Sequence, residues 1–255
     1  MKKFLKVLSV VLAVAMMLSL AVPAFAAGAD TGAASTGNAS TGAASTGDAS
    51  TGGSTTGGST TGGTSGTDDP VERLPFTDVE KDSYYEDAVK WAYSCGITKG
   101  VTATLFGVEK TCTREQAVTF LYRMWKLGGG AEVDSSAENR FVDVKSGTGY
   151  YEAILWAANS GITKGVDATH FAPKDEVTRG QIVTFLHRMA GETKVNQALL
   201  FTDVPEGKFY TDAVRWGVAG GIVKGISATK FAPNDSCNRA QVVTFLYRAF
   251  GDTAK

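Results

Sequence analysis

Histidine, cysteine and excess charge are all scarce in this chain of 255 residues, and each shortage excludes a class of function. The chain holds two histidines and three cysteines, none at metal-ligand spacing, so we expect no metal site. The formal net charge is only −1, whereas nucleic-acid binding needs concentrated lysine and arginine. No motif places two carboxylates as a pair for the hydrolysis of a glycosidic bond. The sequence therefore predicts no nucleic-acid partner, no cofactor, no catalytic residues and no enzymatic activity.

Long apolar runs are also few, and the prominent one lies at the N-terminus. Lysines at positions 2, 3 and 6 precede an apolar segment over residues 7–22, and Ala24-Phe25-Ala26 follows with the small-x-small pattern of a cleavage site. The run is short for a membrane span. We predict a signal peptide over residues 1–26, a secreted protein of formal charge −4, and no membrane span after signal removal. A transmembrane anchor is the alternative.

Large apolar side chains are missing from the stretch that follows. Residues 32–66 are almost entirely Gly, Ala, Ser and Thr, with a five-residue beat of the form Ser-Thr-Gly-x-x. Such a composition cannot bury enough apolar surface to offset the entropy of ordering. We predict a disordered linker over residues 27–70, and its hydroxyl density makes glycosylation an open alternative to an inert spacer.

A threefold internal repeat fills the rest of the chain. Segments 76–123, 141–188 and 201–248 align without a gap, and about 20 of their 48 offsets hold one residue in all three copies. Each copy opens with Phe-x-Asp-Val, continues through a tryptophan and Gly-Ile-x-Lys-Gly, and closes with Arg-x-Gln-x-Val-Thr-Phe-Leu-x-Arg. We expect three modules, over residues 71–128, 136–193 and 196–255.

Two helices are predicted in each module. The first covers about Tyr85 to Ser94 in the first copy, with acidic residues in its first turn and a glycine, Gly96, at its end. The second starts with a capping box, in which Thr or Asn is followed three residues later by Gln. One such module is too small to bury its apolar faces alone. We therefore predict a mainly α fold, with three helix-loop-helix modules packed as one pseudo-threefold domain.

The chemistry of the repeat centres on its arginines. Each second helix has arginine at its first position, where unpaired backbone N–H groups and the helix dipole favour anions. A lysine recurs in the loop before it, which suits a polymer with spaced acidic groups. The predicted binding residues are Arg114, Arg179, Arg239, Lys99, Lys164, Lys224, Trp91, Trp156, Trp216, Asp78, Asp143 and Asp203.

Structural alternatives stand beside several of these roles. The arginines could instead pair with the repeated aspartates, and for the aspartates themselves turn or helix capping is favoured over ligand contact. The tryptophans lie on an apolar helix face and are favoured as core, with stacking on a sugar as the alternative. The lysines could simply be solvated.

The cysteines are interpreted as structural. Cys112 and Cys237 share an offset with Val177, which indicates a small buried apolar site. An odd count cannot pair fully, and Cys95 with Cys112 is the pairing available inside one module. We expect free thiols.

The spaced motifs together resemble the S-layer homology module, present three times. The resemblance rests on Phe-x-Asp-Val, Trp-Ala, Gly-Ile-x-Lys-Gly, Phe-x-Pro and Thr-Arg before an apolar helix, and it covers nearly everything after residue 75. It implies a mostly helical, pseudo-threefold prism with ligand grooves between modules. It also implies location at the cell wall or surface layer, and binding of secondary cell-wall polysaccharide, often through a pyruvylated sugar. Further partners would be a peptidoglycan-linked polymer or other surface-layer proteins.

Two departures from the family pattern affect the expected ligand. The family motif usually reads Thr-Arg-Ala-Glu, whereas all three copies here have Gln at the fourth place, which removes a carboxylate beside each arginine. The first copy also has Phe106-Gly107-Val108 where the others have Phe-Ala-Pro. The predicted function is non-covalent attachment to an anionic wall polysaccharide. The alternative is a structural surface-layer subunit, or a protein that occupies wall sites without cargo.

Overall fold

The computed structural model describes residues 74–131, 133 and 138–251. The predicted signal peptide and linker lie outside the described residues, and the predicted module boundaries remain predictions. Six helices lie in the described part of the chain, two per module, and within it none is long and apolar enough to cross a membrane. They are α2 (Glu86–Ser94), α3 (Arg114–Leu127), α4 (Tyr151–Asn159), α5 (Arg179–Met189), α6 (Thr211–Ala219) and α7 (Arg239–Phe250).

The second helix of each module begins with the capping box that its sequence predicts. At α3 the side chain of Thr113 accepts a hydrogen bond from the Gln116 backbone N–H, and the Gln116 side chain accepts one from the Thr113 backbone N–H. The same reciprocal pair starts α5 and α7. These bonds fix the position of the first helical residue, which in all three cases is the motif arginine.

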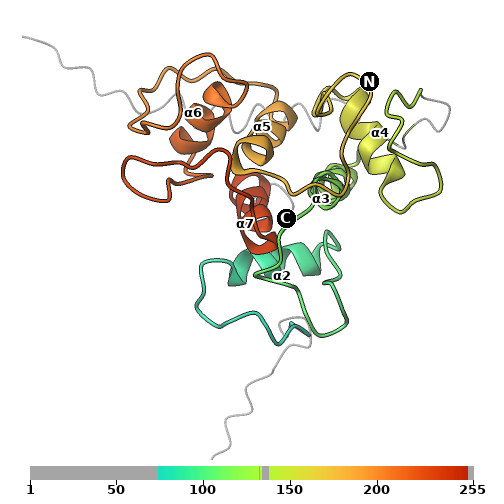
Figure 1. The fold of residues 1–255 in the computed structure, drawn as a ribbon. Coiled ribbons are helices and arrows are strands. Elements are labelled where there is room, and N and C mark those ends of the chain that lie inside the picture. The colour runs from blue at the N-terminus through green and yellow to red at the C-terminus, as the bar shows by residue number, and fades with distance from the viewer. Residues whose placement is uncertain (1–73, 132, 134–137, 252–255) are drawn as a thin grey trace, which may run out of the picture. The chain divides into compact units, whose positions relative to one another are not determined.

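The main helix contacts are made between modules and not within them. The three second helices, α3, α5 and α7, contact one another at the centre, and each first helix packs against the second helix of a different module (Figure 1). Helix α4 lies on α3, α6 on α5, and α2 on α7, so the first module packs on the third and closes the ring. This arrangement confirms one mainly α, pseudo-threefold domain, because no module contains the partner of its own first helix.

A ring of three backbone hydrogen bonds joins the modules at the chain segments just before the second helices. The Cys112 N–H donates to the Cys237 carbonyl, Cys237 to Val177, and Val177 to Cys112, each at 2.9 Å. All three residues are fully buried, as predicted for a small apolar site. The structure contains free cysteines, and burial raises the pKa of the Cys112 and Cys237 thiols to about 12. Cys112 thus neighbours Cys237 of the third module.

Candidate functional site: the grooves between modules

The three motif arginines lie inside the protein, where each joins two modules. Arg114, Arg179 and Arg239 are 2%, 5% and 4% exposed. Each Nε donates to the carbonyl of the repeated phenylalanine of another module, at 2.8 to 2.9 Å, and each guanidinium lies 4.7 to 4.9 Å from the centre of that phenylalanine ring. The acceptors are Phe171, Phe231 and Phe106, in that order. Burial lowers the pKa of all three guanidinium groups, that of Arg114 to about 10. We call this set the arginine layer.

The backbone donors at these helix starts are occupied as well. The N–H of Arg114 donates to the Asp175 carbonyl at 2.8 Å, and the next N–H, of Glu115, donates to the Pro173 carbonyl at 3.0 Å. The starts of α5 and α7 likewise donate to carbonyls of a neighbouring module. The expectation that unpaired N–H groups here attract an anion is therefore wrong. These donors hold the modules together instead.

The repeated aspartates link the two loops of their own modules. Asp78 accepts hydrogen bonds from the backbone N–H groups of Phe106, Gly107 and Val108, at 2.6 to 3.1 Å. Asp143 and Asp203 each accept two such bonds, one of them from the phenylalanine whose carbonyl binds a motif arginine. The sequence predicted that these aspartates cap a nearby turn or helix. In the structure their carboxylates instead accept hydrogen bonds from a loop that is distant in the sequence. Burial opposes ionisation of Asp78 and Asp203, but the backbone hydrogen bonds outweigh it and lower the pKa of both.

The tryptophans lie mainly in the core, as favoured from the sequence. Trp156 and Trp216 are 4% and 2% exposed, while Trp91 is half-buried. Their rings contact aromatic side chains on the second helix against which each first helix packs, with centroids 5.3 to 5.6 Å apart. The three loop lysines, Lys99, Lys164 and Lys224, are all exposed.

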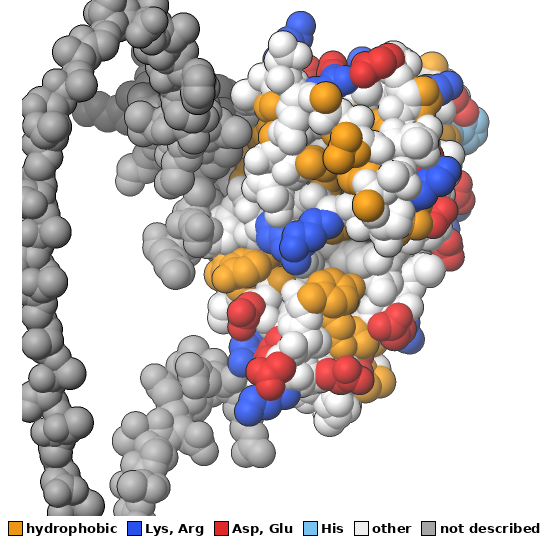
Figure 2. Space-filling view, turned by 90° about the vertical axis from the view of Figure 1, so that its left-hand side faces the viewer, with side chains coloured by type: hydrophobic (Ala, Val, Ile, Leu, Met, Phe, Trp, Pro, Cys, Tyr) orange, Lys and Arg blue, Asp and Glu red, His pale blue; other side chains and the backbone are white. Residues whose placement is uncertain are grey.

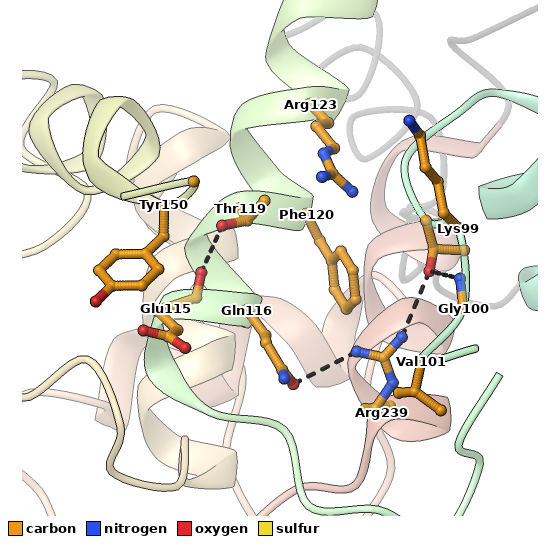
Figure 3. Close-up of a pocket in the computed structure, with 12 residues that line it drawn as sticks. Lys99, Gly100, Val101, Glu115, Gln116, Thr119, Phe120, Arg123, Tyr150 and Arg239 are labelled. Atoms are coloured by element: carbon orange, nitrogen blue, oxygen red, sulfur yellow. Dashed lines mark hydrogen bonds between the residues drawn. The ribbon is translucent and has the colours of Figure 1, made fainter. Parts of the chain in front are cut away.

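A groove of about 430 Å³ lies where parts of all three modules meet (Figure 3). We call it the first groove. Helix α3 forms one wall, the loop that carries Lys99 forms the other, and the start of α4 lies at the edge. Its lining residues are Thr98, Lys99, Gly100, Val101, Glu115, Gln116, Thr119, Phe120, Arg123, Gly149, Tyr150 and Arg239.

The loop that presents Lys99 has a fixed shape. Gly100 has φ +81°, and a Cβ there would lie 2.5 Å from the Phe76 ring and 2.6 Å from the Leu105 carbonyl oxygen, so only glycine fits. Across the groove, Arg123 is half-buried and its Nη1 donates to the Ile97 carbonyl at 2.8 Å. Burial lowers the Arg123 pKa. Two cationic side chains, Lys99 and Arg123, thus line the same groove.

The groove continues past Thr119, Arg123 and Gly149 into a second hollow of about 410 Å³. The start of α4 lines this hollow, including Tyr151 and Glu152. The two hollows share Thr119, Arg123 and Gly149, so they lie next to each other along α3. Polar hydroxyl and amide groups line it beside the cations, and the Phe120 ring supplies an apolar wall.

Two predicted binding residues, Lys99 and Arg239, line the first groove. Sequence reasoning missed Arg123, Glu115 and Tyr150. A signal for Arg123 was present, because an arginine closes the repeated motif in all three copies. Glu115 was distinguishable too, since the other copies have Gly180 and Ala240 at its offset.

The other module boundaries expose more apolar surface. Tyr84 is 57% exposed and Phe209 is 62% exposed, whereas the same offset in the second copy is Gly149. Figure 2 shows the side of the molecule that lies at the left of Figure 1, where α6 lies, and on it a patch of basic side chains is bordered by hydrophobic ones. The grooves are thus chemically unequal.

A trio of helical repeat modules that together build a groove lined by basic side chains is the class of protein that this fold and site define. Residues 75–118, 140–183 and 200–243 match the family model described as the S-layer homology domain, which covers more than half of the chain. The chain belongs to the S-layer homology domain family, and its place is at the cell surface.

Similar proteins include surface proteins and an enzyme. A cell surface protein of Thermoanaerobacter kivui is 36% identical over 46% of this chain and 15% of its own length. The surface-layer 125 kDa protein of Lysinibacillus sphaericus is 30% identical over 61% of this chain and 13% of its own length. An amylopullulanase of Thermoanaerobacterium thermosulfurigenes is 30% identical over 68% of this chain and 9% of its own length. The chain thus spans less than a fifth of each of these relatives.

Proposed function

We propose that this protein attaches non-covalently to the cell surface by binding an acidic wall polysaccharide in the first groove, without catalysis. The observation that carries the proposal is that Lys99 and Arg123 both line a polar groove that three modules build together. An exposed ammonium and a half-buried guanidinium favour a carboxylate, and partial desolvation strengthens the second contact. A pyruvylated sugar, expected from the family resemblance, carries such a carboxylate.

The buried residues have supporting roles in this proposal. The arginine layer and the repeated aspartates fix the loops that form the groove walls, and Arg239 also donates to the Gln116 side chain at 3.4 Å and to the Thr98 hydroxyl at 3.5 Å. Arg114 and Arg179 act in the same way at the other boundaries. Lys164 and Lys224 remain proposed contacts at the equivalent loops, where further sugars of one polymer would multiply weak binding. The tryptophans pack each first helix on the second helix of another module.

Co-sedimentation of the purified chain with cell walls tests this function. We expect the chain to sediment with intact walls of Thermoanaerobacter kivui or Lysinibacillus sphaericus, the organisms of two relatives. After the secondary polysaccharide is stripped from the same walls with acid, we expect the chain to stay in the supernatant. Equal sedimentation with intact and stripped walls would disprove the proposal.

A second candidate is a subunit of a surface lattice, favoured by the likeness to surface-layer proteins. Electron microscopy of the purified chain on wall fragments separates the two candidates. Ordered arrays would favour the lattice, and sparse decoration would favour attachment alone.

A further inference from the structure

Glu115 is the acidic side chain that lines the first groove, and one of its oxygens has no evident partner. The residue is 8% exposed. Its Oε1 accepts a hydrogen bond from the Lys174 ammonium at 2.7 Å, while its Oε2 is buried and lacks a hydrogen bond among the residues that the structure describes. A buried carboxylate oxygen without a donor is costly. Such an oxygen at a binding groove therefore calls for an explanation.

Packing does not require glutamate at this position, as the other two modules show. Gly180 and Ala240 stand at the same offset. At Gly180 the Tyr210 ring lies so close that a Cβ would be 3.0 Å from its Cδ1 atom. Glutamate has no room in that arrangement.

The tyrosine beside Glu115 lies differently from its two counterparts. Tyr85 and Tyr210 are both 6% exposed, whereas Tyr150, at the same offset, is only partly buried. Its ring lies next to the Glu115 side chain at the groove edge (Figure 3). The Lys174 ammonium lies 5.1 Å from the ring centre. The neighbouring Gly149 adds no side chain where the other modules have an exposed aromatic ring. The first groove thus has no side chain at the position where the other two modules have an exposed aromatic ring.

We propose that Glu115 is a specificity-determining residue, whose carboxylate accepts a hydrogen bond from a neutral donor on the bound sugar, a hydroxyl or an amide N–H. This inference rests on the proposed function: the acidic group of the same sugar contacts Lys99 and Arg123, and Glu115 binds its opposite side. The Tyr150 ring is the side chain that moves aside to admit the donor.

The charges around Glu115 select a neutral donor over a cationic amine. The Lys174 ammonium already balances the carboxylate, and the groove is also lined by Lys99, Arg123 and Arg239. A second ammonium on the sugar would therefore face net repulsion. A hydroxyl or an amide N–H supplies the missing hydrogen bond without added charge.

Calorimetric titration of the full chain with wall polysaccharide tests the role of Glu115. The probe is the polysaccharide released by acid from walls of Thermoanaerobacter kivui and Lysinibacillus sphaericus. Glu115→Ala recreates the Arg-Ala-Gln sequence of the third module, so we expect it to fold and to bind about tenfold more weakly. Glu115→Gln retains an acceptor of the same size and should lose about threefold. Thermal unfolding of each variant checks that it is folded.

Lys174→Ala is the matched control, because it removes the ion pair and leaves the carboxylate. We expect this variant to bind within about threefold of the wild type. A loss as large as that of Glu115→Ala would show that Glu115 only holds Lys174, and would overturn the inference. Unchanged binding by Glu115→Ala would overturn it as well, while leaving the proposed function intact. No binding by the wild type to either polysaccharide would overturn both.

Discussion

The arginine layer is almost the same in all three modules, whereas the groove walls around it differ. Each buried guanidinium donates to a phenylalanine carbonyl of another module and lies over that ring. At the rims, by contrast, the offset of Glu115 holds Gly180 and Ala240 in the other two modules, and the offset of Gly149 holds Tyr84 and Phe209. The repeat is strict where modules must fit one another, and it varies where a ligand would be chosen.

Removing an arginine of the layer should give the largest effect on stability. Arg239→Ala leaves the buried Phe106 carbonyl without its donor and opens a cavity, so we expect the free energy of unfolding to fall by about 2 to 4 kcal/mol. Urea denaturation at neutral pH measures it. Arg248→Ala, on the exposed face of the same helix, is the control, with an expected change within about 0.5 kcal/mol. Equal losses in the two variants would contradict a structural arginine layer.

Loss of the hydrogen bonds to a repeated aspartate should lower the free energy of unfolding by less, and the loss should depend on pH. The Asp78 pKa is lowered in the folded state, so its stabilising effect is present above the unfolded pKa of about 4 and is lost as pH falls through the folded pKa. Asp78→Asn should cost about 1 kcal/mol at pH 7. It should also flatten the decline in stability below pH 4. Urea denaturation from pH 2 to 7 measures both, and parallel pH profiles would refute this account.

Exposed lysines sharpen the comparison between grooves. Lys99→Ala should weaken binding of the wall polysaccharide about threefold to tenfold, because its ammonium lines the first groove. The matched variant Lys224→Ala, at the same offset in the third module, should lose less. Titration calorimetry gives both dissociation constants. A larger loss in Lys224→Ala would place the main contact at a different module boundary.

Alkylation of the cysteines tests the packing at the ring of backbone hydrogen bonds that joins the modules. It involves no substitution, so we expect the smallest effect on the protein. Burial raises the pKa of Cys112 and Cys237 to about 12, so both should resist alkylation in the folded protein, whereas the partly exposed Cys95 should react. Mass spectrometry should find one label in the native chain and three after denaturation. A bridge between Cys112 and Cys237 would appear as a mass lower by two hydrogen atoms.

Local features of the fold were predictable from the sequence, and long-range ones were not. The pair Thr113 and Gln116 predicts the start of α3, because a capping box depends only on residues that are close in the sequence. The packing of α2 on α7 leaves no such signal, since the three modules have similar apolar faces and any of them could be the partner. Closure of the ring is decided by the geometry of the whole domain.

The site was predictable only in part for the same reason. Arginine after a capping residue is typical of an exposed anion site, and nothing near Arg179 indicates that the Phe231 carbonyl will occupy it. Glu115 becomes part of a groove only in the folded domain, where Tyr150 of the next module lies beside it. Lys99 was found because its loop is short and bracketed by glycines, so its exposure follows from local geometry.

A crystal structure of the protein with an oligosaccharide cut from the wall polysaccharide tests the central claim most directly. We predict density for an acidic sugar in the first groove, with its carboxylate within hydrogen-bonding distance of Lys99 and Arg123 and the arginine layer unchanged. Density confined to another surface, with the first groove filled by solvent, would contradict it.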